Sequence, residues 1–121
     1  ELFRVTACHV YLTVPFVLSW SLLEAMSCGA LVVGSATAPV QDVIEDGRNG
    51  LLVDFFDHRA LAERLAAVLA DPAGHAGLRR QARRTVVERF DLSQVCLPRQ
   101  LELVDRLMAG AATQEGAAGE R

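Results

Sequence analysis

The sequence contains no lysine, so all 12 of its basic residues are arginines. A phosphate group therefore cannot be held by a lysine ammonium, and only arginine side chains or backbone N–H groups remain for that task. The 15 acidic residues outnumber the basic ones and give a formal net charge of −3. This balance excludes the strongly positive field that non-specific binding of nucleic acid requires, and we expect no nucleic-acid partner.

Cysteine is also scarce. Cys8, Cys28 and Cys96 are an odd number without a CxxC pair, so neither a disulfide framework nor a zinc site is indicated. Apolar residues make up 51% of the chain, which is enough for a packed core. No apolar run reaches the ~20 residues of a membrane span. We expect a globular protein in a reducing, cytoplasmic setting, and 121 residues allow one domain at most.

Three short runs of β-branched and aliphatic residues predict strands, over His9 to Thr13, Ala30 to Gly34 and Leu51 to Val53. The runs are continuous rather than alternating, and helical patterns separate them. Such strands are typical of a parallel sheet that is covered on both faces and joined by right-handed crossovers. The predicted class is α/β, with a partial Rossmann-like sheet of about three strands, flanking helices and a C-terminal helical extension.

The two crossovers predict helices of different length. The first runs from about Ser21 to Cys28 and ends at Gly29, and its apolar residues are Leu22, Leu23, Ala25 and Met26. The second is short, from about Val40 to Glu45. Turns follow at Asp46-Gly47 and Asn49-Gly50, pairs whose residues tolerate positive φ.

The pattern after the third strand is helical. Asp57 is a suitable N-cap for a helix that ends at Asp71-Pro72, with a stripe formed by Leu61, Leu65, Val68 and Leu69. Another helix spans about Pro72 to Phe90, with a thin stripe formed by Leu78, Ala82, Val86 and Phe90. A last helix starts near Ser93, with Pro98 inside it or at a kink and a stripe formed by Val95, Leu97, Leu101, Val104 and Met108. From Ala109 onward no apolar period is visible, and we predict an unstructured tail.

The segment from Pro15 to Gly29 places a loop and a helix N-terminus directly after the first strand. Ligands of open parallel sheets bind beyond the carboxyl ends of the strands, where a helix start offers N–H groups to phosphate. We expect Ser19, Trp20 and Ser21 to present those N–H groups. Glu24 lies one turn further, where its carboxylate can accept hydrogen bonds from vicinal hydroxyls.

Several of these residues have a plainer interpretation. Ser21-x-x-Glu24 is also a capping box, and Trp20 is more often a packing residue than a stacking one. His9 is more often a satisfied core group than a ligand, and Cys28 a small buried filler. The four arginines of the fourth predicted helix form a solvated face, and they are Arg79, Arg80, Arg83 and Arg84.

The run SLLEAMSCGALVVGS, followed by APVQDVIEDGRNGLLVDFFD, closely resembles the C-terminal domain of the group 1 (family four) retaining glycosyltransferases, which have the GT-B fold. In that family the segment typically reads E-x-F-G-x-x-x-L-E-A-M-A-x-G-x-P-V-V, a small-residue loop, and P-E-x-I-x-D-G-x-N-G-x-L-V. The resemblance covers about Val10 to Phe90. The closing FDLSQVCLPRQLELVDRL is similar to the family's C-terminal helix pair.

The resemblance implies donor-binding roles for particular residues. Glu24 matches the second glutamate of the paired-glutamate motif, which holds the ribose of a nucleotide-sugar, and Trp20 and Ser21 match positions whose N–H groups contact the diphosphate. Phe16 stands where the first glutamate contacts donor-sugar hydroxyls, and Ser19 where a glycine is usual. Further departures lie in the next loop and helix, at Thr37 and Ala38 for a Gly pair and Asp42 for Glu.

On this resemblance, residues 1–108 form the distal part of a nucleotide-sugar donor-binding domain. The implied enzyme is a hexosyltransferase-like glycosyltransferase of glycan biosynthesis that retains the anomeric configuration and needs no metal or other cofactor. We expect an upstream N-terminal domain to bind the sugar, lipid or polysaccharide acceptor and to make any contact with the inner membrane. These residues alone are expected to be inactive, and to self-associate through an exposed strand edge.

A second hypothesis remains open at this point. With Phe16 in place of glutamate, the chain is alternatively a degenerate, non-catalytic GT-B-like binding or scaffolding module. A dehydrogenase of the doubly wound class is disfavoured because the chain has no GxGxxG.

Overall fold

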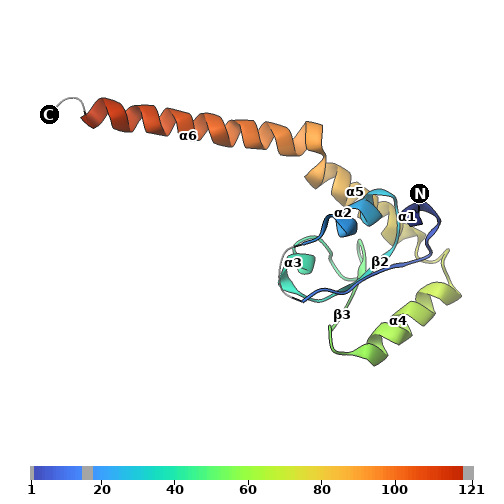
Figure 1. Ribbon diagram of the computed structural model, residues 1–121. Helices are drawn as coiled ribbons and strands as arrows, with labels where there is room; N and C mark the ends of the chain where they lie inside the picture. The colour runs from blue at the N-terminus through green and yellow to red at the C-terminus, as the bar shows by residue number, and fades with distance from the viewer. Residues whose placement is uncertain (1, 15–17, 119–121) are drawn as a thin grey trace. The chain divides into compact units, whose positions relative to one another are not determined.

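A three-stranded parallel sheet organises the first part of the chain (Figure 1). The computed structural model describes residues 2–14 and 18–118, with side chains up to residue 110. The chain divides into two units, residues 1–87 and residues 88–121, and the boundary lies within α5 (Ala76–Phe90). Each unit is described separately.

The strands are β1 (His9–Tyr11), β2 (Val32–Ser35) and β3 (Leu51–Val53), in the order β1-β2-β3. Both pairs are parallel, with Val10 beside Val33 and Gly34 beside Leu52. The predicted class and sheet are confirmed, although β1 is two residues shorter than predicted. Because β1 lies at an edge, the backbone groups on its outer side have no partner strand among the described residues.

Helix α1 (Leu2–Val5) precedes β1, and α2 (Trp20–Ser27) connects β1 to β2. Helix α2 ends in a Schellman motif: the Gly29 N–H donates to Met26 O and the Ala30 N–H to Ala25 O, each at 3.0 Å. This closure requires the positive φ of 74° that Gly29 adopts. The predicted end of the helix is therefore confirmed.

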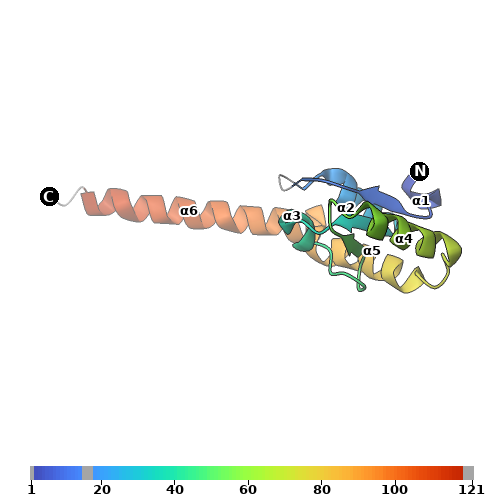
Figure 2. The ribbon, with the colours of Figure 1, turned by 90° about the horizontal axis from the view of Figure 1, so that it is seen from below.

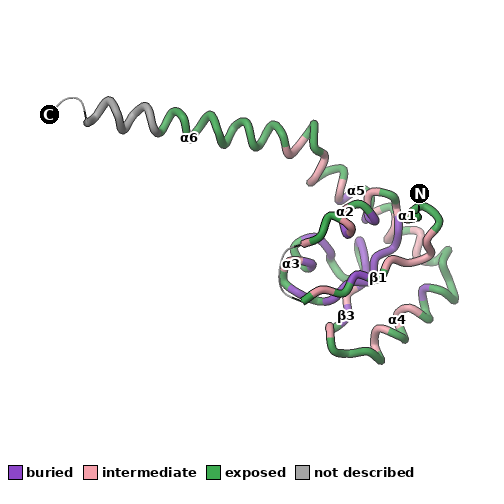
Figure 3. The backbone as a smooth tube through the Cα atoms, viewed as in Figure 1, coloured by how far each residue is buried: buried purple, intermediate pink, exposed green. Residues whose placement is uncertain are grey.

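The two faces of the sheet are covered by different helices, as Figure 2 shows for α2 and α4 (His58–Ala70). On the α4 face, Leu31 and Val33 pack with Val68 in a cluster completed by residues of β3. The buried strands appear as the purple centre of the first unit in Figure 3. On the other face the fully buried side chains include Leu22, Met26, Val32, Val40 and Ile44.

Helix α3 (Ala38–Gln41) is shorter than the predicted Val40-to-Glu45 helix and begins two residues earlier. It starts early because Pro39 occupies its second position, where the missing N–H costs nothing. It ends early because the Glu45 N–H donates to the Asn49 side chain, at 2.8 Å, instead of to a helical carbonyl.

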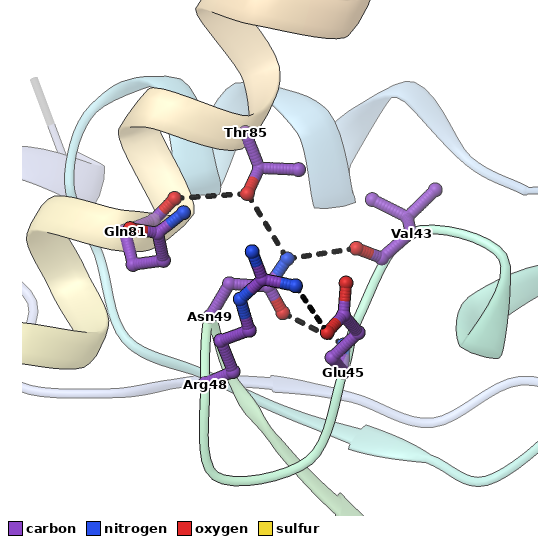
Figure 4. A network of polar contacts seen from close by, with 6 residues as sticks. All are labelled: Val43, Glu45, Arg48, Asn49, Gln81 and Thr85. Carbon is purple, nitrogen blue, oxygen red and sulfur yellow. Dashed lines mark hydrogen bonds and ion pairs between the residues drawn. The ribbon is translucent and has the colours of Figure 1, made fainter.

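Asn49 links the loop before β3 to α5 (Figure 4). Its buried side-chain amide donates to Val43 O at 2.9 Å and to the Thr85 hydroxyl at 3.1 Å. The Thr85 hydroxyl in turn donates to Gln81 O at 2.9 Å. Residues 47–49 form a turn before β3, as predicted, and among the described residues only Gly29 and Gly47 have positive φ. Asn49 is therefore a turn residue whose side chain is also a buried amide.

Helix α4 begins where predicted, because the Asp57 carboxylate accepts from the Ala60 N–H at 2.8 Å. Val68 is buried and Leu61 and Leu65 pack against the core, whereas Leu69 is 61% exposed and does not belong to the buried stripe. Helix α5 starts four residues later than the predicted Pro72, because residues 72–75 form turns.

The second unit contains a π-helical turn, η1 (Leu92–Cys96), followed by α6 (Leu97–Ala118). Asp91 caps the turn by accepting from the Gln94 N–H at 2.7 Å, and Pro98 lies in the first turn of α6, where it is tolerated. The backbone remains helical from Ala109 to Ala118, so the predicted tail has helical structure there. Small residues with good helix propensity extend the helix without an apolar stripe.

Candidate functional site

Ser19 closes the N-terminus of α2 at the carboxyl edge of the sheet. Its hydroxyl accepts from the Ser21 N–H at 3.3 Å and lies 3.1 Å from the Ser21 hydroxyl. Its carbonyl accepts from the Leu22 N–H at 3.2 Å. The Trp20 N–H has no partner among the described residues, as is usual for the first residue of a helix.

Tyr11 fixes this helix start to the sheet. Its phenol oxygen accepts from the Ser19 N–H at 2.8 Å, and Tyr11 is itself buried at the end of β1. The expectation that Ser19 offers its N–H to a ligand is therefore wrong, because Tyr11 occupies it. The neighbouring strand β2 is also bonded to the segment after β1. The Thr13 N–H donates to the Ser35 hydroxyl at 3.0 Å, and that hydroxyl donates to Thr13 O at 2.9 Å.

Glu24 is the fifth residue of α2 and is exposed, and its carboxylate has no partner among the described residues. The capping-box alternative is wrong. Ser19 is the N-cap, so the third helical position is Leu22 and Glu24 is two residues too far along to reach back to the cap. The Glu24 carboxylate is therefore available for another partner.

Trp20 is the first residue of α2, and it is 80% exposed. The packing alternative is wrong within the described residues, since the indole is not covered by them. Phe16, the remaining predicted site residue, lies outside the described residues. Of the departures from the family pattern, Thr37 is buried with a hydroxyl that lacks a partner there, whereas Ala38 and Asp42 are exposed.

The other candidates lie away from this helix start. His9 packs edge-on against Phe3, with ring centroids 5.0 Å apart. Its Nε2 is buried without a described partner, so it is not the satisfied core group that we expected. Burial lowers the pKa of His9 and raises the pKa of the Cys8 thiol. Cys28 is exposed, not a buried filler, because it caps the C-terminus of α2.

The arginines of α5 are only partly a solvated face. Arg80, Arg83 and Arg84 are exposed as expected. Arg79 is half-buried and donates to Ala7 O, and Arg83 donates to Ser27 O in the last turn of α2. These two guanidinium groups therefore act as structural donors that join α5 to distant segments.

Neither a metal centre nor a membrane span is found in the described part of the chain. No group of three His, Cys, Asp or Glu side chains there could hold a metal ion. None of the described helices combines the length and the apolar character needed to cross a bilayer.

Comparison with known proteins bears directly on this arrangement. A family model described as glycosyl transferases group 1 matches residues 17–85, which is more than half of the chain and includes β2, β3 and the whole of α2. The chain belongs to this family. The group 1 glycosyl transferase match thus spans the Ser19-to-Glu24 segment described above.

Individual relatives agree with the family. A D-inositol 3-phosphate glycosyltransferase of Xylanimonas cellulosilytica is 43% identical over 50% of this chain. An alpha-maltose-1-phosphate synthase of Mycobacterium tuberculosis is 41% identical over 48% of it. The chain spans only 14% and 18% of the lengths of these two proteins.

Solved structures show the same fold. Sucrose-phosphate synthase from Thermosynechococcus elongatus superposes with a TM-score of 0.79 and 30% identity over 90% of this chain and 27% of its own. Anabaena HepE, solved with UDP, gives a TM-score of 0.76 over 89% of this chain and 29% of its own. At 22% identity, that second likeness concerns the fold alone. The chain is a GT-B-type α/β unit.

Two residues that fix the site have no distinct signal in the sequence. In the sequence, Tyr11 has the pattern of an ordinary strand residue. The only indication of a polar contact is its hydroxyl, because the strand ends there and a helix start follows. Ser35 reads as the end of a buried run. Their roles depend on contacts with Ser19 and Thr13, 8 and 22 residues away in sequence, which no local pattern encodes.

Proposed function

We propose that this chain forms the distal part of the donor-binding domain of a retaining glycosyltransferase. The reaction transfers a sugar from a nucleotide-sugar to an acceptor hydroxyl: the bond from the anomeric carbon to the diphosphate oxygen breaks, and a bond to the acceptor oxygen forms. The observation that carries the proposal is Glu24, whose exposed carboxylate lies in the helix that starts at the carboxyl end of β1. In this role it accepts hydrogen bonds from the ribose hydroxyls.

The start of α2 supplies the complementary part of the donor site. The free Trp20 N–H and the Ser21 N–H point out of a helix N-terminus, where negative charge is favoured. The Ser21 N–H donates to the Ser19 hydroxyl at 3.3 Å, a long bond that a phosphate oxygen can replace. These donors stabilise the negative charge that develops on the diphosphate as it leaves.

Further parts of the proposal lie outside the described residues. No lysine is present to balance the diphosphate, so we propose that basic side chains elsewhere in the protein do so, and that an N-terminal domain binds the acceptor. A donor domain of this kind needs no metal when such cations are present. We also propose a cytoplasmic location, and no activity for these 121 residues alone.

Calorimetry tests the assignment of Glu24. Nucleoside diphosphates and nucleotide-sugars that contain uracil, guanine or adenine are titrated into the protein and into its Glu24→Gln variant. This substitution keeps the shape of the side chain but removes its charge. Loss of hydrogen bonds to a carboxylate should weaken binding by about 10-fold or more. Glu63→Gln, an exposed glutamate of α4 paired with Arg59, is the matched control and should bind as the parent does. Equal binding by Glu24→Gln, or no binding of any nucleoside diphosphate, would refute the proposal.

Phe16 supports the second candidate, a non-catalytic donor-type module, because a phenyl ring cannot accept a hydrogen bond from a sugar hydroxyl. Sugar transfer by the full-length parent protein is compared with transfer by its Phe16→Glu variant, because these 121 residues alone are proposed to be inactive. Turnover by the parent at the ordinary rate of a glycosyltransferase rules this candidate out. An inactive parent that Phe16→Glu makes active supports it.

A further inference from the structure

The exposed indole of Trp20 is the starting observation. Covering a tryptophan removes roughly 150–250 Å² from water, yet at 80% exposure almost none of this gain is realised in the described structure. Exposed apolar residues are common on proteins, so exposure alone does not indicate a site. What distinguishes Trp20 is how rigidly its backbone is held and what surrounds it.

The residues on both sides of Trp20 are fixed by hydrogen bonds. The Ser19 N–H is held by the buried Tyr11 at 2.8 Å, and the Ser21 N–H and the Leu22 N–H are held by Ser19. The indole is therefore presented from a helix start that is anchored to the sheet. A tryptophan has only two side-chain torsion angles, so on such a backbone it loses little conformational entropy when a ligand covers it.

The polar groups at the same helix start indicate the chemistry of the ligand. The Ser19 and Ser21 hydroxyls flank Trp20 in the sequence and lie 3.1 Å apart. An exposed apolar ring at a helix start that also carries two hydroxyl groups matches a molecule with an apolar face and a hydroxylated rim. A pyranose ring has both, because its axial C–H groups form a face and its equatorial hydroxyls form the rim.

The place of Trp20 in the proposed donor site also favours a saccharide as the ligand. The Trp20 N–H is assigned above to the diphosphate. The indole therefore belongs to the same residue that contacts the diphosphate, to which the donor sugar is attached. Phe16, at the position that the family pattern gives to sugar-hydroxyl recognition, has no hydrogen-bonding group. Recognition of the sugar by its apolar face replaces recognition through that missing carboxylate.

We propose that the Trp20 indole is the stacking platform for the pyranose ring of a saccharide bound at this helix start. The inference rests on the proposed function, since it takes the α2 N-terminus as the diphosphate site. The ring belongs either to the nucleotide-sugar donor or to a saccharide acceptor, and the arms of the experiment separate these two sources.

The experiment combines ¹⁹F NMR with calorimetry. The protein is labelled with 5-fluorotryptophan, and the Trp20 resonance is identified as the one that Trp20→Phe removes. Probes are UDP-glucose, GDP-mannose and ADP-glucose, each paired with its free nucleoside diphosphate, and maltose as the acceptor-type saccharide. If the donor sugar stacks, a nucleotide-sugar shifts the resonance and its nucleoside diphosphate alone does not. If an acceptor stacks, maltose shifts it instead.

Substitutions give the energetic test. Trp20→Ala should weaken binding of the stacking saccharide about 10-fold, whereas Trp20→Phe should keep it within about 3-fold and the affinity for the nucleoside diphosphate should change less than 2-fold in both. The matched control is Phe56→Ala, which removes another aromatic side chain that is 77% exposed, in the loop after β3. It should leave saccharide binding unchanged.

Three results would overturn the inference. The first is a shift as large with UDP, GDP or ADP alone, which would assign the indole to the base. The second is a Trp20 resonance already shielded from solvent without ligand, which would mean that another part of the protein covers it. The third is saccharide binding that Trp20→Ala leaves unchanged. Absence of nucleoside diphosphate binding in calorimetry is the separate failure of the proposed function, and it removes the inference with it.

Discussion

Replacing Asn49 with alanine should destabilise the first unit by about 2–4 kcal/mol. The side chain is 3% exposed and makes three hydrogen bonds, to Glu45 N, Val43 O and the Thr85 hydroxyl, at 2.8 to 3.1 Å. Each such bond contributes about 0.5–1.5 kcal/mol net, and the upper part of the range applies because alanine leaves Glu45 N and Val43 O without their partner. The loop before β3 would then lose its attachment to α5.

Urea denaturation followed by circular dichroism measures this loss. A change of this size should lower the midpoint by about 0.7–4 M, given slopes of about 1–3 kcal/mol/M for small proteins. Thr85→Val removes one of the three bonds and should cost about 1 kcal/mol. Arg48→Ala is the matched control. It breaks an exposed ion pair with Glu45, 2.5 Å long and drawn in Figure 4, and should cost less than about 1 kcal/mol.

This reasoning would be refuted if the free energy of unfolding of Asn49→Ala were less than about 1 kcal/mol below that of the parent. It would mean that water or a neighbouring group satisfies Glu45 N and Val43 O in the variant. A double-mutant cycle between Asn49 and Thr85 adds an independent check, because contacting residues should show a coupling energy and unconnected ones should not.

Two further predictions concern β1. Burial lowers the pKa of His9, so as pH falls the unfolded chain takes up the proton first. The stability that the neutral ring provides is present above pH about 6.5 and is lost as pH falls below that value. Thermal melts should show a smaller loss for His9→Gln than for the parent between pH about 7 and 5, and equal losses would contradict the assignment. The free edge of β1 should also allow the chain to self-associate, seen by light scattering as a mass that rises with concentration. Because the His9 N–H donates to Leu31 O, the Val10 N–H points away from β2, and Val10→Pro should reduce the association without breaking the sheet. A constant monomer mass for the parent would exclude this mode of association.

The parts of the fold that the sequence predicts well are those with a local cause. The run from Leu51 to Val53 is preceded by turn residues and followed by an Asp, and it forms a strand with the predicted bounds. Gly29 ends α2 because a left-handed residue is needed there, and Asp57 starts α4 because its carboxylate caps an N–H. In each case the deciding contact lies within a few residues of the one that signals it.

The errors have non-local or competing causes. The Asn49 side chain bonds Thr85, which lies 36 residues later, and no turn propensity predicts such a contact. Ser21 and Glu24 have the spacing of a capping box, but Ser19 is a cap of equal quality two residues earlier and α2 starts there. That choice decides the site, because it leaves the Glu24 carboxylate free. The exposure of Trp20 likewise depends on where the helix starts and not on the residue itself.

Helix α5 has a consequence for the order of folding. Through Arg79, Arg83 and Thr85 it bonds Ala7, Ser27 and Asn49, which are 72, 56 and 36 residues distant in sequence. Contacts of such long range close large loops and form slowly. During synthesis the whole sheet leaves the ribosome before the helix that bonds to these three segments. The N-terminal 75 residues should therefore remain open to proteases and chaperones until α5 is complete, and truncation before Ala76 should give a chain that does not reach the native state.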